Sequence, residues 1–318
     1  MDQIAHRFIP VNGLKLHIAE VGSESSPAVI FLHGFPETWY TWRHQMIAVA
    51  NAGFRAIAPD FRGYGLSDSP TEPEKASFTD MINDTASILD SLAISKVFVI
   101  GKDFGAIVAY PFALQHPEKV AGIITLGLPF MPPGAFTNQF VLPEGFYPRR
   151  WQEPGRAEAD FSRFDVKTVV RNIYILFSQS ELQIADENQE IMDLVKPATP
   201  LPSWFTKEDI EIYAASYEKS GFRTALQVPY RTLNTVGSEV QDPKVEVPTT
   251  VIMGEEEYLL KIPGMGEYIR SGEVKKYVPK QETIYVPHGS HFLPEQFPNK
   301  VNQLILNFLN QNKHLALV

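Results

Sequence analysis

The segment GKDFG, residues 101–105, combines a tight turn with a carboxylate side chain. It follows the apolar run VFVIG and precedes an apolar stretch, so the pattern predicts a strand, a sharp turn and a helix. Glycine on both sides fits this reversal, which crowds the backbone and strains the middle residue. The turn would expose Asp103 at the carboxyl edge of a sheet, where ligands bind. The pattern is that of a nucleophile elbow with aspartate in place of serine. An aspartate that only caps the helix is the alternative.

Three further motifs come directly after apolar runs and could act together with Asp103. HGFP (33–36) can aim a backbone N–H toward the elbow. The glutamates at 255–257 follow a strand-like run, and GSHF (289–292) follows another. Taken singly, these motifs also fit a strand-ending turn, a solvated charge run and an ordinary loop histidine. Together they supply a nucleophile, an acid and a histidine in one fixed order, which favours hydrolytic chemistry.

The elements that must position these residues form an α/β pattern. Short apolar runs rich in β-branched residues recur with helical patterns between them. Continuous rather than alternating hydrophobicity predicts strands buried on both faces, hence a mostly parallel central sheet flanked by helices. The predicted strands are AVIFLH (28–33), FRAIAP (54–59), VFVIG (97–101), VAGIITLG (120–127), TTVIMG (249–254) and TIYVP (283–287).

Between about residues 130 and 240 the strand pattern stops, and aromatic, proline-rich and helical segments replace it. We therefore expect a helical cap inserted into the sheet domain. Thr206 and Asp209 predict the start of a cap helix, and Gly221 predicts its end. The segment 299–313 predicts a last helix with one face on the core, formed by Val301, Leu304, Ile305, Phe308 and Leu309.

The composition excludes several classes of function. The net charge of −9 argues against a protein that binds nucleic acid, because such proteins carry basic patches. The absence of cysteine excludes disulfides, zinc–thiolate sites and thiol catalysis, and it fits a reducing compartment. The N-terminus lacks a signal-peptide pattern, and no apolar stretch reaches the ~18 residues that span a membrane. We expect a cytoplasmic protein that uses no membrane.

These motifs resemble those of the α/β-hydrolase superfamily and, within it, the soluble epoxide hydrolases, especially the plant type. The resemblance implies an α/β-hydrolase fold with core segments at 1–130 and 241–318 and a helical cap, or lid, at 131–240. It also implies a cofactor-independent epoxide hydrolase. It covers nearly the whole chain, in HGFPETWYTWR, APDFRGYGLSD, the aspartate elbow, WQEPG, LPSWFTKEDIEIYAASYEKSGF, MGEEEYLLKIPG and GSHFLPEQFP.

The resemblance implies a role for each motif. Asp103 matches the nucleophile, which attacks an sp3 carbon and leaves an ester that water can remove, whereas a serine would leave a stable ether. His291 matches the base that activates this water, and Glu257 takes the place of the acid that orients the histidine. The backbone N–H groups of Phe35 and Phe104 match the oxyanion hole. The resemblance also implies a cis peptide between Phe35 and Pro36.

The family also uses two cap tyrosines as acids on the epoxide oxygen, since a phenol is a neutral hydrogen-bond donor. Tyr147, four residues before Trp151, matches the first tyrosine, and Tyr230 in VPYR matches the second. Pro229 departs from the usual segment at the second position. Packing aromatics with solvated hydroxyls are the alternative. We expect Trp151 to contact the substrate, and Phe161, Phe164 and Trp204 add to an apolar cap that suggests epoxy fatty acids or aryl epoxides.

Three residues depart from the family pattern near the predicted site. Glutamate replaces aspartate at 257, so that any of the three glutamates could orient the histidine. Lys102 stands where histidine is common, and Phe104 where tryptophan is frequent. We hypothesise that Lys102 pairs with Glu37, that the two lie at the substrate site, and that Lys102 lowers the pKa of Asp103. The alternative is that Lys102 turns outward to water.

Other interpretations remain open on the sequence alone. A haloalkane or haloacid dehalogenase shares the aspartate elbow, but Phe104 offers no indole N–H for a halide. A non-catalytic hormone-binding hydrolase fold is a further alternative, and a serine esterase is disfavoured because G-x-S-x-G is absent. His288 and His291 make a poor metal site, and no nucleotide motif occurs, so we expect neither metal nor cofactor. The expected partners are a small hydrophobic epoxide and water, and the chain is expected to be a monomer or a homodimer.

Overall fold

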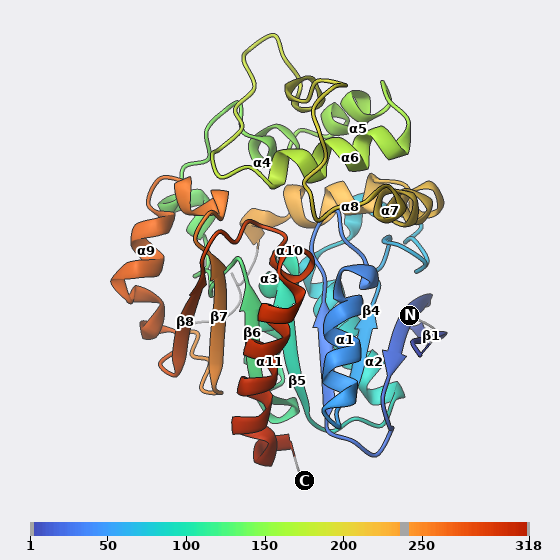
Figure 1. The fold of residues 1–318 in the computed structure, drawn as a ribbon, viewed down its shortest axis with the longest axis vertical. Helices are drawn as coiled ribbons and strands as arrows, with labels where there is room; N and C mark the ends of the chain where they lie inside the picture. The colour runs from blue at the N-terminus through green and yellow to red at the C-terminus, as the bar shows by residue number, and fades with distance from the viewer. Residues whose placement is uncertain (1–2, 236–241, 317–318) are drawn as a thin grey trace.

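The computed structural model describes residues 3–235 and 242–316, and one eight-stranded sheet forms its centre (Figure 1). The strand order is β1-β2-β4-β3-β5-β6-β7-β8. The first two strands are antiparallel, β2 pairs antiparallel with β4, and the other pairs are parallel. The strands are β1 (Ala5–Val11), β2 (Leu14–Val21), β3 (Ala28–Leu32), β4 (Arg55–Pro59), β5 (Val97–Lys102), β6 (Val120–Leu126), β7 (Thr249–Gly254) and β8 (Gln281–Val286).

All six predicted strands are present, and a hairpin that the sequence analysis missed adds two more. Asn12 and Gly13 join β1 to β2, and both have positive φ, 49° and 83°. Asn-Gly between strand-like segments is a strong hairpin signal, because both residues tolerate this backbone region. β1 escaped the analysis because its side chains alternate in exposure and do not form a continuous apolar run.

Helices cover both faces of the sheet, which explains why the parallel strands are apolar throughout. Apolar residues of α1 and α11 pack in one core cluster, and those of α2 and α3 pack in another on the opposite face (Figure 1). The predicted face of α11 is confirmed, except that Leu304 is only half-buried. These helices are α1 (Arg43–Asn51), α2 (Phe78–Ser91), α3 (Phe104–Gln115), α9 (Met265–Ser271), α10 (Leu293–Gln296) and α11 (Pro298–Asn312).

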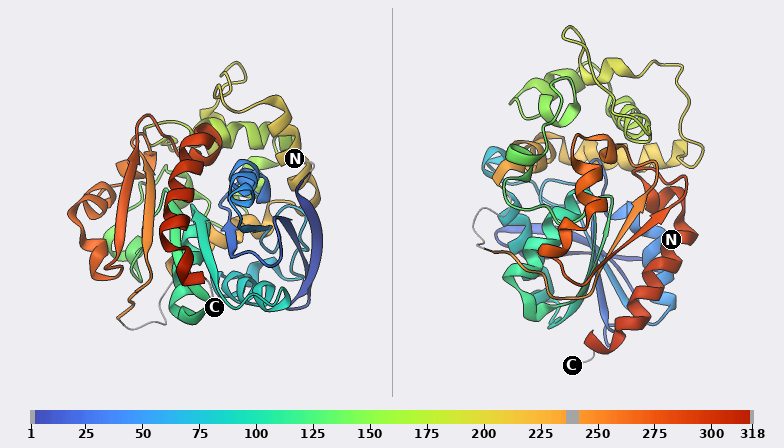
Figure 2. Two further views of the ribbon diagram at one scale, coloured as in Figure 1. Left: turned by 60° about the horizontal axis from the view of Figure 1, so that its bottom comes forward. Right: turned by 90° about the vertical axis from the view of Figure 1, so that its left-hand side faces the viewer.

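The chain between β6 and β7 forms helices beyond the carboxyl end of the sheet, as the right-hand view of Figure 2 shows. The predicted helix α7 begins after Thr206, whose side chain accepts the Asp209 N–H in a capping box, and ends before Gly221. The helices here are α4 (Tyr147–Arg150), α5 (Arg156–Phe161), α6 (Val166–Phe177), α7 (Lys207–Ser220) and α8 (Arg223–Leu226).

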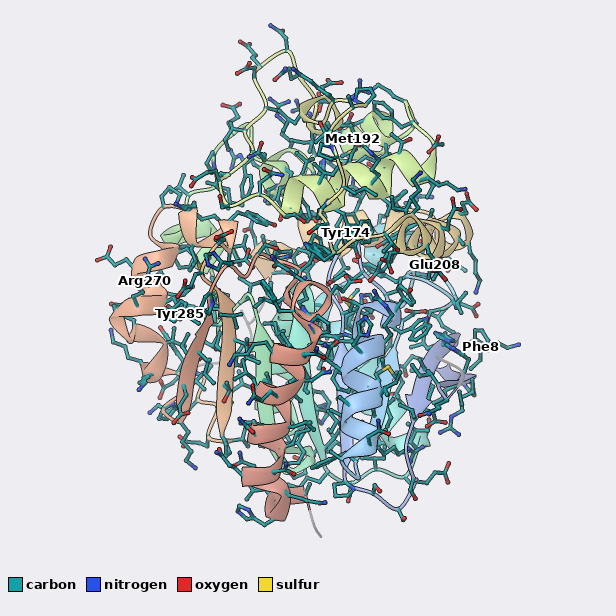
Figure 3. The ribbon with its side chains drawn as sticks, viewed as in Figure 1. Phe8, Tyr174, Met192, Glu208, Arg270 and Tyr285 are labelled. Atoms are coloured by element: carbon teal, nitrogen blue, oxygen red, sulfur yellow. The ribbon has the colours of Figure 1, made fainter. Side chains whose placement is uncertain are left out.

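Buried polar contacts join these helices to the sheet domain. Arg43 of α1 lies 3.0 Å from Asp209 of α7 and 2.8 Å from Glu295 of α10. The Tyr213 hydroxyl of α7 donates to Glu295 at 3.2 Å. Figure 3 places Tyr174 of α6 at the same junction, where its ring stacks on Phe292 with centroids 4.3 Å apart. The upper helices are therefore bound to the sheet domain by charge as well as by apolar packing.

Two further features concern the helices. Helix α3 runs from Phe104 to Gln115 with Pro111 inside it, and the helix is not interrupted there. Within the described ranges, no helix is both long and apolar enough to cross a membrane.

Candidate active site

Asp103 lies between β5 and α3 at a turn that only small neighbours permit. Its φ of 52° and ψ of −118° fall in a region that residues other than glycine rarely adopt. A Cβ on Gly105 would lie 2.0 Å from the Leu32 carbonyl oxygen, and one on Gly101 would lie 2.5 Å from the Gly105 carbonyl oxygen. The backbone geometry is that of the elbow predicted from GKDFG.

The loop after β3 closes against the Asp103 side chain. The Phe35 N–H donates a hydrogen bond to Asp103 Oδ2 at 3.1 Å, and the peptide between Phe35 and Pro36 is cis, as expected. A Cβ on Gly34 would lie 2.6 Å from Asp103 Oδ2, so glycine is required for this approach. Phe104 follows Asp103 as the first residue of α3. One carboxylate oxygen of Asp103 is therefore held by a backbone donor.

His291 is buried and contacts Glu257 through one ring nitrogen. Its Nδ1 lies 3.0 Å from both carboxylate oxygens of Glu257. Its Nε2 is buried and has no hydrogen-bond partner within residues 3–235 and 242–316. Glu255 and Glu256 are exposed, and Glu256 contacts His288 at 3.1 Å on the surface. Of the three candidate glutamates, Glu257 is the one that meets the histidine.

Lys102 and Glu37 form a buried pair beneath the elbow, as hypothesised. Lys102 Nζ lies 3.1 Å from Glu37 Oε1, and both side chains are fully buried. Glu37 Oε2 also accepts the Gly34 N–H at 3.1 Å, and its Oε1 accepts the Thr41 hydroxyl at 2.9 Å. Glu37 thus supports the loop that contacts Asp103.

Lys102 lowers the pKa of Asp103, as hypothesised, but the pKa of this carboxyl is raised overall. Burial raises the pKa of this carboxyl above its ordinary value, because the charged form loses its hydration. His291, Lys102 and the Phe35 N–H act in the opposite direction without cancelling the effect of burial. The contribution of Lys102 therefore has the predicted sign, and burial, which the sequence analysis did not consider, outweighs it.

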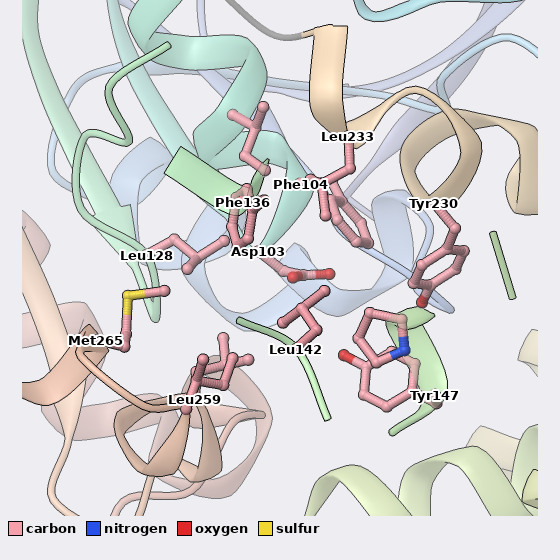
Figure 4. Close-up of a pocket in the computed structure, with 13 residues that line it drawn as sticks. Asp103, Phe104, Leu128, Phe136, Leu142, Tyr147, Tyr230, Leu233, Leu259 and Met265 are labelled. Carbon is pink, nitrogen blue, oxygen red and sulfur yellow. The ribbon is translucent and has the colours of Figure 1, made fainter. Parts of the chain in front are cut away.

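Tyr147 and Tyr230 face Asp103 across a cavity (Figure 4). Their ring centroids are 5.8 Å apart, and both residues are buried. Burial raises the pKa of each phenol well above 10, so each keeps its hydrogen. The Tyr230 hydroxyl has no hydrogen-bond partner in the described part of the chain. The Tyr147 hydroxyl lies 2.7 Å from that of Tyr258, a residue the sequence analysis did not single out although it directly follows Glu257.

The cavity lining is apolar except at Asp103, Tyr147 and Tyr230. The empty volume of the cavity is about 410 Å³. The apolar lining consists of Phe104, Ile107, Leu128, Phe136, Leu142, Pro148, Leu233, Leu259, Ile262 and Met265.

Several residues expected at the substrate lie behind this lining. Trp151 packs against Tyr230 with ring centroids 5.0 Å apart, and it supports the tyrosine from behind. Glu37 and Lys102 lie under the loop of Gly34 and do not reach the cavity wall. The expected cap aromatics Phe161, Phe164 and Trp204 are also absent from the lining. The sequence could not distinguish residues that line the cavity from residues that pack behind the lining, because both sets are mostly apolar or aromatic.

The described ranges contain no cluster of three or more His, Asp or Glu side chains that could hold a metal ion.

Comparisons with known proteins show what the whole chain is similar to. Residues 27–298 match the alpha/beta hydrolase fold family. Epoxide hydrolase 3 of Siraitia grosvenorii is 38% identical over 321 residues, which cover 98% of this chain and 100% of that protein. Bifunctional epoxide hydrolase 2 of Mus musculus is 30% identical over 97% of this chain and 56% of its own length.

Solved structures are also similar over almost the whole chain. An epoxide hydrolase from Vigna radiata superposes with a TM-score of 0.88 at 34% identity and covers 98% of this chain and 99% of its own. Potato (Solanum tuberosum) epoxide hydrolase I gives a TM-score of 0.86 at 32% identity, with 97% and 99% covered.

Proposed function

The chain belongs to the α/β-hydrolase fold family and, within it, to the epoxide hydrolases, and from this premise we propose that it converts hydrophobic epoxides to vicinal diols through an ester on Asp103. The observation that carries the proposal is the meeting of Asp103, Tyr147 and Tyr230 in one apolar cavity, with His291 and Glu257 paired beside it. The described part of the expected cap, residues 131–235, serves as the lid of this cavity, and the expected boundary between residues 240 and 241 lies outside the described residues.

In the first step, Asp103 attacks an epoxide carbon. Oδ2 is held by the Phe35 N–H, so Oδ1 is the attacking oxygen. A new C–O bond forms to the substrate, the epoxide C–O bond breaks, and its electron pair stays on the epoxide oxygen. The low polarity of the cavity strengthens each of these charge interactions.

The two phenols act on the epoxide oxygen during this step. Both are protonated at neutral pH and both face Asp103, so they can donate hydrogen bonds to the developing alkoxide. The unpartnered hydroxyl of Tyr230 supports this role, because a buried hydroxyl without a partner costs free energy that a substrate oxygen would recover.

In the second step, water removes the ester. His291 Nε2 is buried and unpartnered within the described ranges, as a base that accepts a proton from water requires. Glu257 holds Nδ1 and stabilises the imidazolium that forms. The negative charge on the ester oxygen develops at Oδ2, where the N–H groups of Phe35 and Phe104 would receive it.

The cavity indicates the class of substrate. A lining that is apolar except around Asp103 favours an epoxide with alkyl or aryl substituents over a charged one. A dehalogenase is disfavoured, because two phenols face the nucleophile and Phe104 supplies no indole donor. A binding protein without catalysis is disfavoured by the intact pairing of His291 with Glu257.

The test is to trap the ester. The His291→Gln variant would be exposed to alkyl and aryl epoxides and to haloalkanes and then weighed intact by mass spectrometry, with the His291→Gln/Asp103→Ala variant as control. The proposal expects an increase equal to the whole epoxide, absent from the control. An alkyl adduct without halogen would indicate a dehalogenase, and no adduct from any compound would overturn the proposal.

A further inference from the structure

A third buried tyrosine, Tyr258, contacts Tyr147 from outside the cavity. Tyr258 is the first residue of a short 3-10 helix, η8 (Tyr258–Lys261), and only 3% of it is exposed. Its hydroxyl lies 2.7 Å from that of Tyr147, the usual distance for an O–H···O hydrogen bond. Tyr258 does not line the cavity, so its hydroxyl meets Tyr147 and not a bound substrate.

The direction of this hydrogen bond decides what Tyr147 can do. A phenol has one hydrogen to donate and two lone pairs that accept. If Tyr147 donated to Tyr258, its only hydrogen would be engaged before an epoxide arrived. If Tyr258 donates, the Tyr147 hydrogen stays free to point into the cavity. Only the second arrangement leaves both Tyr147 and Tyr230 free to donate a hydrogen bond to the epoxide oxygen.

The surroundings of Tyr258 favour it as the donor. Burial, and then the neighbouring Tyr147 and Glu257, raise the pKa of Tyr258 well above 10, so it holds its hydrogen. Of the two residues, Tyr147 lines the cavity and Tyr258 does not, so an epoxide oxygen can accept the hydrogen of Tyr147 and not that of Tyr258. Donation from Tyr258 to Tyr147 is therefore the arrangement in which each hydrogen has an acceptor once the epoxide is bound.

We propose that Tyr258 is a positioning residue for ring opening, which donates a hydrogen bond to Tyr147 and thereby directs the Tyr147 hydrogen to the epoxide oxygen. This inference rests on the proposed function. As Asp103 forms its bond to carbon, the epoxide oxygen takes the Tyr147 hydrogen, and the negative charge moves to the Tyr147 oxygen. There the Tyr258 hydrogen bond becomes charge-assisted and therefore stronger than in the resting enzyme.

The proton balance closes in the hydrolysis step. One hydrogen of the attacking water goes to His291 and then to the leaving alkoxide, which departs as the diol. The second hydrogen remains on the regenerated Asp103 carboxyl and returns to the Tyr147 oxygen. The cycle consumes only the epoxide and water.

Tyr258 also lies beside the groups of the hydrolysis step. It directly follows Glu257, and its ring centroid is 5.2 Å from that of His291. Glu257 is the N-cap of the short helix that begins at Tyr258, so one turn of the chain places both the carboxylate that holds the histidine and the phenol that holds Tyr147. A change in this turn would affect both steps, whereas loss of the hydroxyl alone should affect only ring opening.

The experiment measures the alkylation rate in single turnovers, by stopped-flow tryptophan fluorescence, for Tyr258→Phe, Tyr147→Phe and the double variant. Tyr258→Phe should slow alkylation roughly 10- to 100-fold, the range for a hydrogen bond to a charged group. It should cause no further loss in the Tyr147→Phe background, and ester hydrolysis should be unchanged. Tyr268→Phe is the matched control, since it removes another buried hydroxyl, which bonds the Phe130 carbonyl at 2.9 Å.

Two outcomes would overturn the positioning role. An unchanged alkylation rate in Tyr258→Phe is one. An equal loss with and without the Tyr147 hydroxyl is the other, because that is the result of disturbed packing. Failure of the proposed function is distinguishable, since no epoxide would then alkylate Asp103 in His291→Gln, and the positioning role would fall with it. If that adduct forms while Tyr258→Phe alkylates at the wild-type rate, only the role of Tyr258 fails.

Discussion

His291 Nδ1 lies 3.0 Å from both oxygens of the Glu257 carboxylate, within a site where both side chains are buried. The longer glutamate side chain thus reaches the histidine where relatives were expected to use aspartate. The ring is held with Nδ1 toward the carboxylate, which leaves Nε2 as the nitrogen that can take a proton.

Replacing Glu257 should therefore slow hydrolysis and spare alkylation. Glu257→Gln removes the negative charge that stabilises the imidazolium, and we expect the hydrolysis rate to fall by about 10² to 10⁴. The ester on Asp103 should then accumulate during turnover, which quenched-flow sampling and intact mass spectrometry would detect. Glu256→Gln, on the surface beside His288, is the control and should behave as wild type. Equal slowing of both steps would contradict this role.

Lys102 and Glu37 should shift the acid limb of the pH profile in opposite directions. Asp103 attacks only when ionised, so kcat/KM falls as the pH drops through its pKa. Lys102 lowers this pKa and Glu37 raises it. The limb should therefore move to higher pH in Lys102→Met and to lower pH in Glu37→Gln, with a non-ionisable epoxide as substrate. pH profiles that superimpose on that of wild type would show that neither charge affects the pKa of Asp103.

Stability must be controlled in these two variants. Each leaves a buried charge without its partner, which typically costs about 3–5 kcal/mol. The double variant Lys102→Met/Glu37→Gln removes both charges and should recover much of this loss. Urea unfolding of all three variants would check that the pH profiles are recorded on folded protein.

Tyr230 should contribute to activity at the expense of stability. Its buried hydroxyl lacks a partner within the described ranges, so Tyr230→Phe should leave the unfolding free energy unchanged or raise it by up to about 1 kcal/mol. The same variant should lower kcat/KM by about 10²-fold, because one of the two donors to the epoxide oxygen is lost. Thermal unfolding and steady-state kinetics on one preparation would test both parts. A variant that loses stability but keeps activity would exclude this role.

Glu295 should make the protein less stable as the pH rises toward neutrality. Burial raises its pKa from 4.5 to about 7, against the opposing effect of Arg43. Between these values the folded state binds more protons than the unfolded state. The stabilisation that Glu295 contributes is therefore fully present below about pH 4.5 and is lost as the pH rises through about 7. This loss lowers the free energy of unfolding by about 3 kcal/mol in total.

Comparison with a neutral side chain isolates this effect. Glutamine does not titrate, so the Glu295→Gln variant should lack the part of the decline in unfolding free energy that Glu295 causes. The difference in unfolding free energy between wild type and this variant should therefore change between pH 5 and pH 8. Urea unfolding at both values measures it. A difference that is the same at both pH values would show that Glu295 does not titrate in this range.

Much of the fold could be predicted because one physical signal, the continuous apolar strand, marks buried parallel sheet. The six strands were found in this way, whereas helix α7 was found from the capping residues Thr206 and Asp209 and from Gly221 at its end. The β1–β2 hairpin was missed because the side chains of β1 alternate in exposure and because the turn, Asn12-Gly13, was not considered. Strand periodicity and turn chemistry are separate signals, and only the first was used there.

The site residues came together because motifs at the carboxyl ends of parallel strands converge on one edge. Asp103, His291 and Glu257 could therefore be predicted without knowing how residues 131–235 fold. The cavity wall could not be predicted, because the sequence does not say which apolar residues of a cap face inward. Tyr258 was hidden for a related reason, since a tyrosine after a glutamate run has no pattern of its own until the fold brings it to Tyr147.

The contacts of Arg43 have a consequence for the timescale of turnover. Swinging helix α7 away from the sheet domain would separate this buried guanidinium from Asp209 and pull Tyr213 away from Glu295, at a cost of several kcal/mol. Exchange of substrate and product should therefore rely on local movements of the wall around Leu142, whose neighbour Val141 is 73% exposed. Such movements take nanoseconds to microseconds, whereas domain motions take microseconds to milliseconds. Diol release would then be fast, and the rate of turnover would report the chemical steps.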